Sequence, residues 1–272
     1  MKPTFVLLFA LISSLPALSQ DSWVGAWLQR VTATQAEQPH WVTPVATVTP
    51  RLEQEFRSDF VHQFTPTGDT ITSLGGGKGL EIIPTHNTEL LINVPPYLVH
   101  SNPATPDGFG DVSFLLKYRV LSHNEEHGNY ILTAFLGGSI PTGSHKNGAA
   151  SAIVTPTIAF GKGWQKFDIQ ATLGIGLPVD DTAEIGRALI SNTAFQYHVS
   201  RFLWPEIELN ATHWYGGVRD GKTQNFVTPG LVLGRFPIHH RVGLTLATGF
   251  QIATSNFYQY NHAFIGSIRV PF

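Results

Sequence analysis

Charged side chains recur at every second position near residue 51, and this spacing places them on one face of an extended strand. Five of them share this face: Arg51, Glu53, Glu55, Arg57 and Asp59. Facing charges of both signs can orient a solute inside a channel. They can also pair across a narrow lumen and close it, because an unpaired buried charge is very costly. The pattern leaves both interpretations open.

The same alternation places further charged side chains on the inward faces of later segments. Glu81 and Arg269 have this parity. Together with the first five residues, the following complete the predicted lining of a lumen and solute path: Glu89, Asp111, Lys117, Arg119, Lys166, Asp168, Glu206, Glu208 and Arg241.

A hydrolytic site is a competing interpretation. His198 and Ser200 lie two positions apart and therefore on one strand face, and Glu206 or Glu208 on the next strand would be the third member of a triad. The tripeptide resembles the His-x-Ser of lipid A deacylating barrels, but the surrounding residues do not match. We therefore predict no catalytic residue and treat a lipid-modifying enzyme as the remote alternative.

Other kinds of site have little support in the sequence. The twelve His residues are scattered without the spacing of metal ligands, so we predict no metal and no cofactor. The formal charge is -2 and no cluster of Lys and Arg is present, which argues against a nucleic-acid partner.

The composition raises the question of which solvent the surface faces. Only 13% of the 272 residues are charged, against about 25% in typical soluble domains, while 18 are Phe and none is Cys. Without Cys, no disulfide framework can hold an exported chain together. A packed core or a membrane must do so.

Alternating apolar and polar residues predict strands along most of the chain. In residues 164–179 and 241–252, apolar side chains occupy one face while Gly, Thr and charged residues occupy the other. We predict twelve strands, at residues 47–63, 73–84, 87–98, 109–121, 129–141, 150–161, 164–178, 187–199, 203–215, 224–236, 239–252 and 260–272.

The predicted connections alternate between mostly short turns and longer loops rich in Gly, Pro, Asp and Asn, with the turn at 122–128 as the exception. Outer-membrane barrels have this asymmetry. Lipid tolerates a sheet only when it closes, because an open edge leaves backbone groups unpaired. We therefore predict an all-β fold, a closed transmembrane antiparallel β-barrel of about twelve strands with both termini periplasmic. A soluble sandwich or propeller is the alternative.

Residues 1–20 have the pattern of a secretory signal peptide, with Lys2 before an apolar run and the small residues Ala17 and Ser19 near the end. The run is too short for a spanning helix, which disfavours a membrane anchor. We predict export, removal of the signal peptide and a location in the bacterial outer membrane.

The two ends of the mature chain differ. Residues 21–46 carry three Trp without strand alternation, and we predict a periplasmic segment that forms a small plug, with an interfacial anchor or a disordered leader as alternatives. Residues 47–272 form the barrel. The closing strand turns Phe264, Ile268, Val270 and Phe272 to lipid, and its terminal Phe is similar to the signal that barrel-assembly machinery recognises.

Three stretches resemble the outer-membrane family labelled MetA-pathway of phenol degradation. They are GFGDVSFLLKYRVL at 108–121, TELLINVPPYL at 88–98 and SIPTGS at 139–144. The resemblance implies a twelve-strand barrel with a transport function that gene context ties, in some members, to aromatic catabolism.

We accordingly expect a passive, porin-like channel for small aromatic or amphipathic solutes, with lipid and the assembly machinery as its partners. A non-transporting barrel, structural or displaying loops 99–108, 142–149 and 179–186, is the alternative. The sequence leaves the solute and the oligomeric state open.

Overall fold

The computed structural model describes residues 23–145 and 147–272, so the predicted signal peptide lies outside the described residues. The helices are α1 (Trp23–Ala36) and α2 (Thr182–Ile185). The strands are β1 (Glu55–Phe64), β2 (Thr70–Thr85), β3 (Thr88–Ile92), β4 (Tyr97–His100), β5 (Gly108–Phe109), β6 (Val112–His123), β7 (Tyr130–Ile140), β8 (Ile153–Trp164), β9 (Phe167–Pro178), β10 (Arg187–Tyr197), β11 (Leu203–Tyr215), β12 (Thr223–His239), β13 (Val242–Ala253) and β14 (His262–Pro271). In the described residues no helix is long and apolar enough to cross a membrane.

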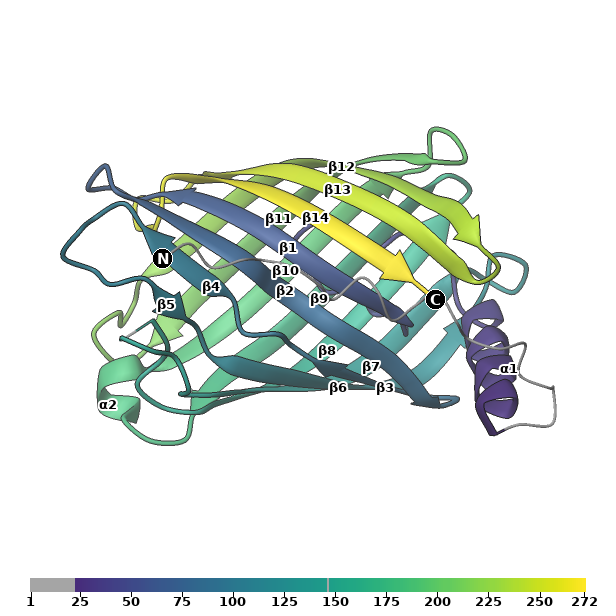
Figure 1. Cartoon of the computed structure of the whole chain (residues 1–272), viewed down its shortest axis with the longest axis horizontal. Coiled ribbons are helices and arrows are strands. Elements are labelled where there is room, and N and C mark those ends of the chain that lie inside the picture. The colour runs from purple at the N-terminus through teal and green to yellow at the C-terminus, as the bar shows by residue number, and fades with distance from the viewer. Residues whose placement is uncertain (1–22, 146) are drawn as a thin grey trace, which may run out of the picture.

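The strands form one closed antiparallel barrel (Figure 1). β1 pairs with β2 on one side and with β14 on the other, where Phe56 lies opposite Val270. β3 and β4 are two pieces of one crossing, as are β5 and β6, so the wall has 12 strands. The predicted all-β, closed, twelve-strand barrel is confirmed. Closure leaves no sheet edge unpaired, as hydrocarbon requires.

The third crossing is interrupted at Pro95 and Pro96, which have no backbone N–H to donate to a ladder. β3 ends at Ile92 and β4 begins at Tyr97. Asn93 N still donates to Ser113 O at 2.9 Å, and Gly110 N donates to Pro96 O at 2.8 Å. The neighbouring crossing therefore stays in register on both sides of the interruption.

The alternation of side chains is the one that the sequence predicted. Outward residues such as Ile158, Leu173 and Ile268 are more than half exposed, whereas Ala159 and Ser267, on the opposite face, are buried. An exposed apolar belt around a closed sheet is the surface that lipid covers.

The connections differ in length between the two ends of the barrel (Figure 1). At the end where α1 and the C-terminus lie, which we call the α1 end, β2–β3 and β8–β9 are joined by two residues each, and the longer turn 124–129 joins β6 to β7. At the opposite loop end, the connections include 101–107, 141–152 and 179–186. The predicted asymmetry is present.

The first predicted strand, 47–63, was wrong at its start, because β1 begins at Glu55. A strand in the wall buries every second residue, but here consecutive residues of both parities are buried: Arg51, Leu52, Glu53 and Gln54. This stretch lies inside the barrel and is surrounded on all sides. The alternative of a disordered leader is also wrong for the described residues, since Trp23–Ala36 is helical and most of residues 38–54 are buried.

Candidate functional site: the barrel lumen and the segment within it

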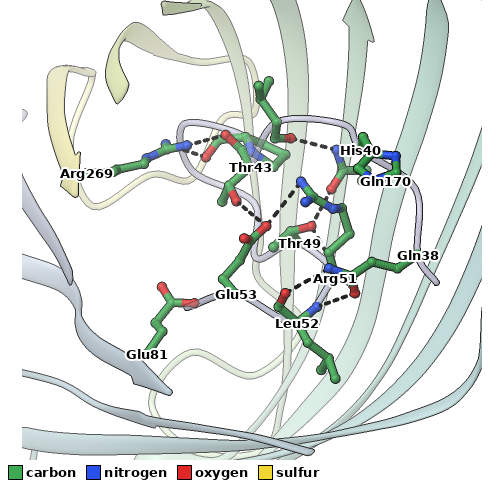
Figure 2. Close-up of polar contacts among 12 residues, drawn as sticks. Gln38, His40, Thr43, Thr49, Arg51, Leu52, Glu53, Glu81, Gln170 and Arg269 are labelled. Atoms are coloured by element: carbon green, nitrogen blue, oxygen red, sulfur yellow. Dashed lines mark hydrogen bonds and ion pairs between the residues drawn. The ribbon is translucent and has the colours of Figure 1, made fainter. Parts of the chain in front are cut away.

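Residues 37–54, which we call the lumen segment, run from α1 into the barrel and return to the start of β1 (Figure 2). The segment contains Pro39, Pro44 and Pro50 and takes no part in the sheet. Its backbone groups must find partners elsewhere, because a buried unpaired N–H or C=O is costly. The inward side chains of the wall supply these partners.

Two carboxylates of β11 bind backbone N–H groups near the middle of the segment. Val45 N donates to Glu206 Oε1 at 2.8 Å, and Ala46 N donates to Glu208 Oε1 at 2.7 Å. Thr47 N donates to the second oxygen of Glu208. Three consecutive amides are thus bound by two neighbouring inward residues of one strand.

Two guanidinium groups from another part of the wall bind the carbonyls of the same stretch. Arg57 donates to Val45 O and Arg269 donates to Pro44 O at 2.7 Å and to Thr43 O. Asp59 holds Arg57 in place, with 2.8 Å between Nε and Oδ1. β1 and β14 are adjacent, so the first and last strands jointly bind the carbonyls.

Lys117 of β6 is the centre of a second cluster. Its Nζ lies 2.9 Å from Glu89 Oε1 and donates to Arg51 O at 3.0 Å. The other oxygen of Glu89 accepts the N–H of Glu53. Lys117 and Glu89 are fully buried, and Lys117 Nζ lies 3.9 Å from Glu81. Their charges compensate one another while both bind the segment's backbone.

Neutral amides complete the attachment. Gln170 of β9 donates to Val42 O at 3.0 Å and accepts from Thr49 Oγ1 at 2.7 Å. Gln54 accepts the N–H of Ile83 at 2.9 Å. Gln170 also donates to Gln196 of β10 at 2.8 Å. The sequence prediction missed these glutamines because they carry no charge, although inward parity could have identified Gln170 and Gln196.

At the α1 end, the segment's entry is fixed to the wall by an ion pair and by a hydrogen-bonded His–Glu contact. Arg119 Nη2 lies 2.9 Å from Glu37, and His40 Nδ1 lies 2.7 Å from Glu125 in the β6–β7 turn. Partial burial acts to raise the pKa of Glu125, but the hydrogen bonds from His40 outweigh it and lower that pKa to about 2. Glu125 is therefore a firmly ionised anchor.

The structure brings most of the predicted lining residues together in the lumen. Those that are buried around the lumen segment are Arg57, Asp59, Glu89, Lys117, Arg119, Asp168, Glu206 and Glu208, with Glu55 at the start of β1. Arg51 and Glu53 are also buried there, but on the lumen segment and not on a wall strand. Their side chains form an ion pair of 3.1 Å.

Three predicted lining residues lie near the ends of the barrel. Asp111 precedes β6 at the loop end, where it accepts the N–H groups of Gly143 and Ala149. Lys166 is exposed in the β8–β9 turn, and Arg241 lies in the β12–β13 turn, where it donates to Thr32. The alternation of side-chain direction along a strand does not extend to these positions, because each lies at or beyond the end of a strand.

The proposed triad is not assembled. Glu206 and Glu208 are engaged by the lumen segment, and Nε2 of His198 is buried without a hydrogen-bond partner. The His198 ring instead stacks on Trp204, with 3.9 Å between the ring centroids. In the described residues no three His, Cys, Asp or Glu side chains are grouped so that they could hold a metal ion.

The closing strand has the predicted orientation over its length. Phe264 and Ile268 of β14 are exposed on the outer face. Val270 is half-buried, and Phe272 follows the strand and donates its N–H to Gln54 O at 3.0 Å. The end of the chain is therefore joined to the end of the lumen segment.

Cavities remain on both sides of the segment. One of about 310 Å³ lies at the α1 end beside Trp41, Arg51 and Trp204. Another, of about 180 Å³, is lined by Val48 of the segment and by wall residues nearer the loop end, including Leu115 and Ile190. The segment therefore lies between two cavities of one lumen.

Comparison with known proteins agrees with this architecture. Residues 51–265 match the family described as "Putative MetA-pathway of phenol degradation". The COG4313 outer membrane channel from Pseudomonas putida F1 is 18% identical, with a TM-score of 0.58 over 85% of this chain and 100% of that chain. OmpF of Salmonella typhi, in complex with daunomycin, is 11% identical, with a TM-score of 0.37 over 79% of this chain and 96% of that chain. No curated protein matches the chain.

The first of these structures shares the barrel fold with this chain. The family match extends over most of the barrel and agrees with the resemblance in the three sequence stretches. The chain therefore belongs to the family described as "Putative MetA-pathway of phenol degradation".

Proposed function

We propose that this protein is an outer-membrane channel through which small aromatic or amphipathic solutes diffuse passively, and that the lumen segment is its constriction. The observation that carries the proposal is how the segment is held. Side chains of the wall, chiefly Glu206, Glu208, Arg57 and Arg269, bind it without any ladder pairing. Such contacts can be exchanged for water or solute while the barrel wall stays intact.

Two further facts support a channel. Cavities of about 310 Å³ and 180 Å³ flank the segment, so a small displacement of residues 43–48 would join them. The Pseudomonas putida protein of the same fold is described as an outer membrane channel. No energy source is needed for diffusion down a gradient.

The proposal includes the topology and assembly of the barrel. The α1 end, with its short turns, would face the periplasm, as in other bacterial barrels. Export would remove residues 1–20, and the assembly machinery would recognise the closing strand through Phe264, Ile268, Val270 and Phe272. The outward apolar belt would contact outer-membrane lipid.

The test is single-channel recording from residues 21–272 in planar bilayers. We expect discrete conductance steps, and a larger conductance when Glu206→Gln and Glu208→Gln together weaken the attachment of the segment. Glu184→Gln, in the exposed helix α2, is the matched control and should leave conductance unchanged. Substitutions of Arg57 and Lys117 would follow.

The alternative is a barrel that transports nothing and displays its loops. The pairing of Arg57 with Asp59 and of Lys117 with Glu89 favours it, because these charges compensate each other inside the lumen. Silent bilayers, from protein that a heat-dependent gel shift shows to be folded, would refute the channel and support this alternative.

A further inference from the structure

Positively charged side chains from three separate parts of the chain meet at the α1 end. Two adjoining cavities, of about 310 Å³ and about 460 Å³, are both lined by Arg51, Arg201 and Arg235. Arg51 belongs to the lumen segment, Arg201 to the β10–β11 turn and Arg235 to β12. Arg241 lines the larger cavity as well. Folding, and not local sequence, creates this cluster.

The positive charge exceeds the negative charge around these cavities. The residues that line the larger cavity include four Arg, but no Asp or Glu. Glu53 and Glu55 line the smaller cavity, where Arg269 is also present. Glu53 is already paired with Arg51 at 3.1 Å. Positively charged side chains therefore outnumber negatively charged ones around the two cavities, which favours a small anion.

Donor groups at the site lack partners. Nε of Arg51 and Nε of Arg241 are buried without a hydrogen-bond acceptor, and Arg51 as a whole is only 9% exposed. Partial burial and the nearby Arg235 both lower the pKa of Arg241, which lies in a turn. Buried donors normally have an acceptor, so such groups call for one.

Flat aromatic rings form the other wall of the smaller cavity. Trp41 and Trp204 are 4% and 7% exposed. The His198 ring lies parallel to Trp204, with an angle of 6° between the ring planes. Arg235 and these rings line the same cavity. The small exposed parts of these rings therefore lie in the same cavity as a group of guanidinium donors.

We propose that these two cavities form a binding site for a small aromatic carboxylate. The carboxylate would be bound by Arg51, Arg235 and Arg241, since guanidinium groups match its planar geometry. The ring would lie against Trp41 and Trp204. The inference deepens the proposed function, on which it rests for a role in transport, by naming the class of solute.

The size and position of the site favour a small molecule over a macromolecular anion. The cavities together fall within the range of about 300–1,000 Å³ that is typical of small-ligand sites. Arg51 is buried and Arg241 half-buried in these hollows, whereas Arg201 and Arg235 are exposed at their rim. A lipid headgroup or a polyanion would need that charge on the outer face.

Isothermal titration calorimetry on the detergent-folded protein tests the site, with benzoate as the probe. We expect benzoate to bind at least about tenfold more tightly than its neutral analogue benzamide, and more weakly as salt rises. Arg235→Gln should weaken benzoate binding by about tenfold, because it removes one charge-assisted contact. Arg235→Lys, which keeps the charge, should bind more tightly than Arg235→Gln.

Controls separate this effect from unfolding. Arg187→Gln, at the exposed loop-end start of β10, should leave benzoate affinity unchanged. If Arg235→Gln fails to fold, Arg201→Gln, in an exposed turn, replaces it and should also weaken binding. Equal affinities for benzoate and benzamide would overturn the proposal, as would unchanged binding in the folded arginine variants. If phosphate bound as tightly as benzoate, the site would be one for an inorganic anion and the proposal of an aromatic carboxylate would be wrong.

Calorimetry tests the carboxylate site and conductance tests the channel, so either proposal can be wrong without the other. If benzoate binds but bilayers stay silent, the channel proposal is wrong and the site stands. If bilayers conduct but no benzoate binding is detected, the carboxylate site is wrong and the channel stands.

Discussion

Two hydrogen bonds join Gln38 to Leu52, which lie near the two ends of the lumen segment. The Gln38 amide nitrogen donates to Leu52 O at 2.8 Å, and its oxygen accepts Leu52 N at 2.9 Å. Both residues are fully buried. The side chain of one residue thus copies a pair of ladder hydrogen bonds and closes the segment into a loop inside the barrel.

Gln38→Ala should destabilise this loop. The change leaves the N–H and C=O of Leu52 buried without partners, which costs about 1–3 kcal/mol of unfolding free energy. Urea unfolding of the detergent-folded barrel measures the effect. Gln29→Ala, on the exposed side of α1, is the control and should cost less than about 0.5 kcal/mol. Equal midpoints for the two variants would mean that the Gln38 contacts do not stabilise the fold.

The carboxylates of β11 should control the mobility of the segment. The chain has no Cys, so Val48→Cys introduces a single reporter thiol next to the cavity of about 180 Å³. Glu208→Ala removes the acceptor of Ala46 N and Thr47 N, and we expect maleimide to label the introduced thiol several-fold faster in that background. Glu184→Ala combined with Val48→Cys should leave the labelling rate unchanged. If Val48→Cys alone and both double variants are labelled at the same rate, the β11 carboxylates do not control the mobility of the segment.

Removing one partner of the Lys117–Glu89 ion pair should destabilise the fold much more than removing the charges of both. Lys117→Met leaves the buried Glu89 carboxylate without its cation and should cost about 3–5 kcal/mol. The double variant with Glu89→Gln should recover part of this loss, since the uncompensated charge is gone. Denaturant midpoints measure both, and Lys222→Met, in an exposed loop, is the control. This account would be refuted if the double variant lost more unfolding free energy than the two single variants lose together.

Glu125 gives the barrel a defined dependence on acid. Its pKa is about 2 in the folded protein, below the ordinary value of 4.5. A lowered pKa means that this carboxylate stabilises the fold above about pH 4.5, and that the contribution is lost as the pH falls toward 2. The side chain is 41% exposed, so solvent keeps the effect modest.

The pH effect can be measured by comparing the wild type with Glu125→Gln. Their unfolding midpoints in urea should differ near pH 7 and converge as the pH falls to about 2. Glu126→Gln, at the neighbouring exposed position, should show no such convergence. A difference that is the same at both pH values would mean that the His40 contact does not depend on the charge of Glu125.

Local sequence determined the wall of this protein. Alternation of apolar and polar residues is a property of neighbouring positions, so it predicted twelve crossings, their faces and the two kinds of connection. The inward placement of Glu206, Glu208, Lys117 and Arg57 follows from the same period. These predictions hold because a lipid-facing strand must expose one face and bury the other at every step.

Only the tertiary structure decided the contents of the lumen. Residues 51–54 alternate as a strand does, yet they lie within the barrel, because a surrounding wall buries both of their faces. The partners of the inward charges, such as Glu208 with Ala46 or Arg269 with Pro44, are more than 160 residues apart in the chain. The arginine cluster at the α1 end arises in the same way. Such contacts depend on which side chains face each other across a closed lumen, and no local pattern of residues encodes that relationship.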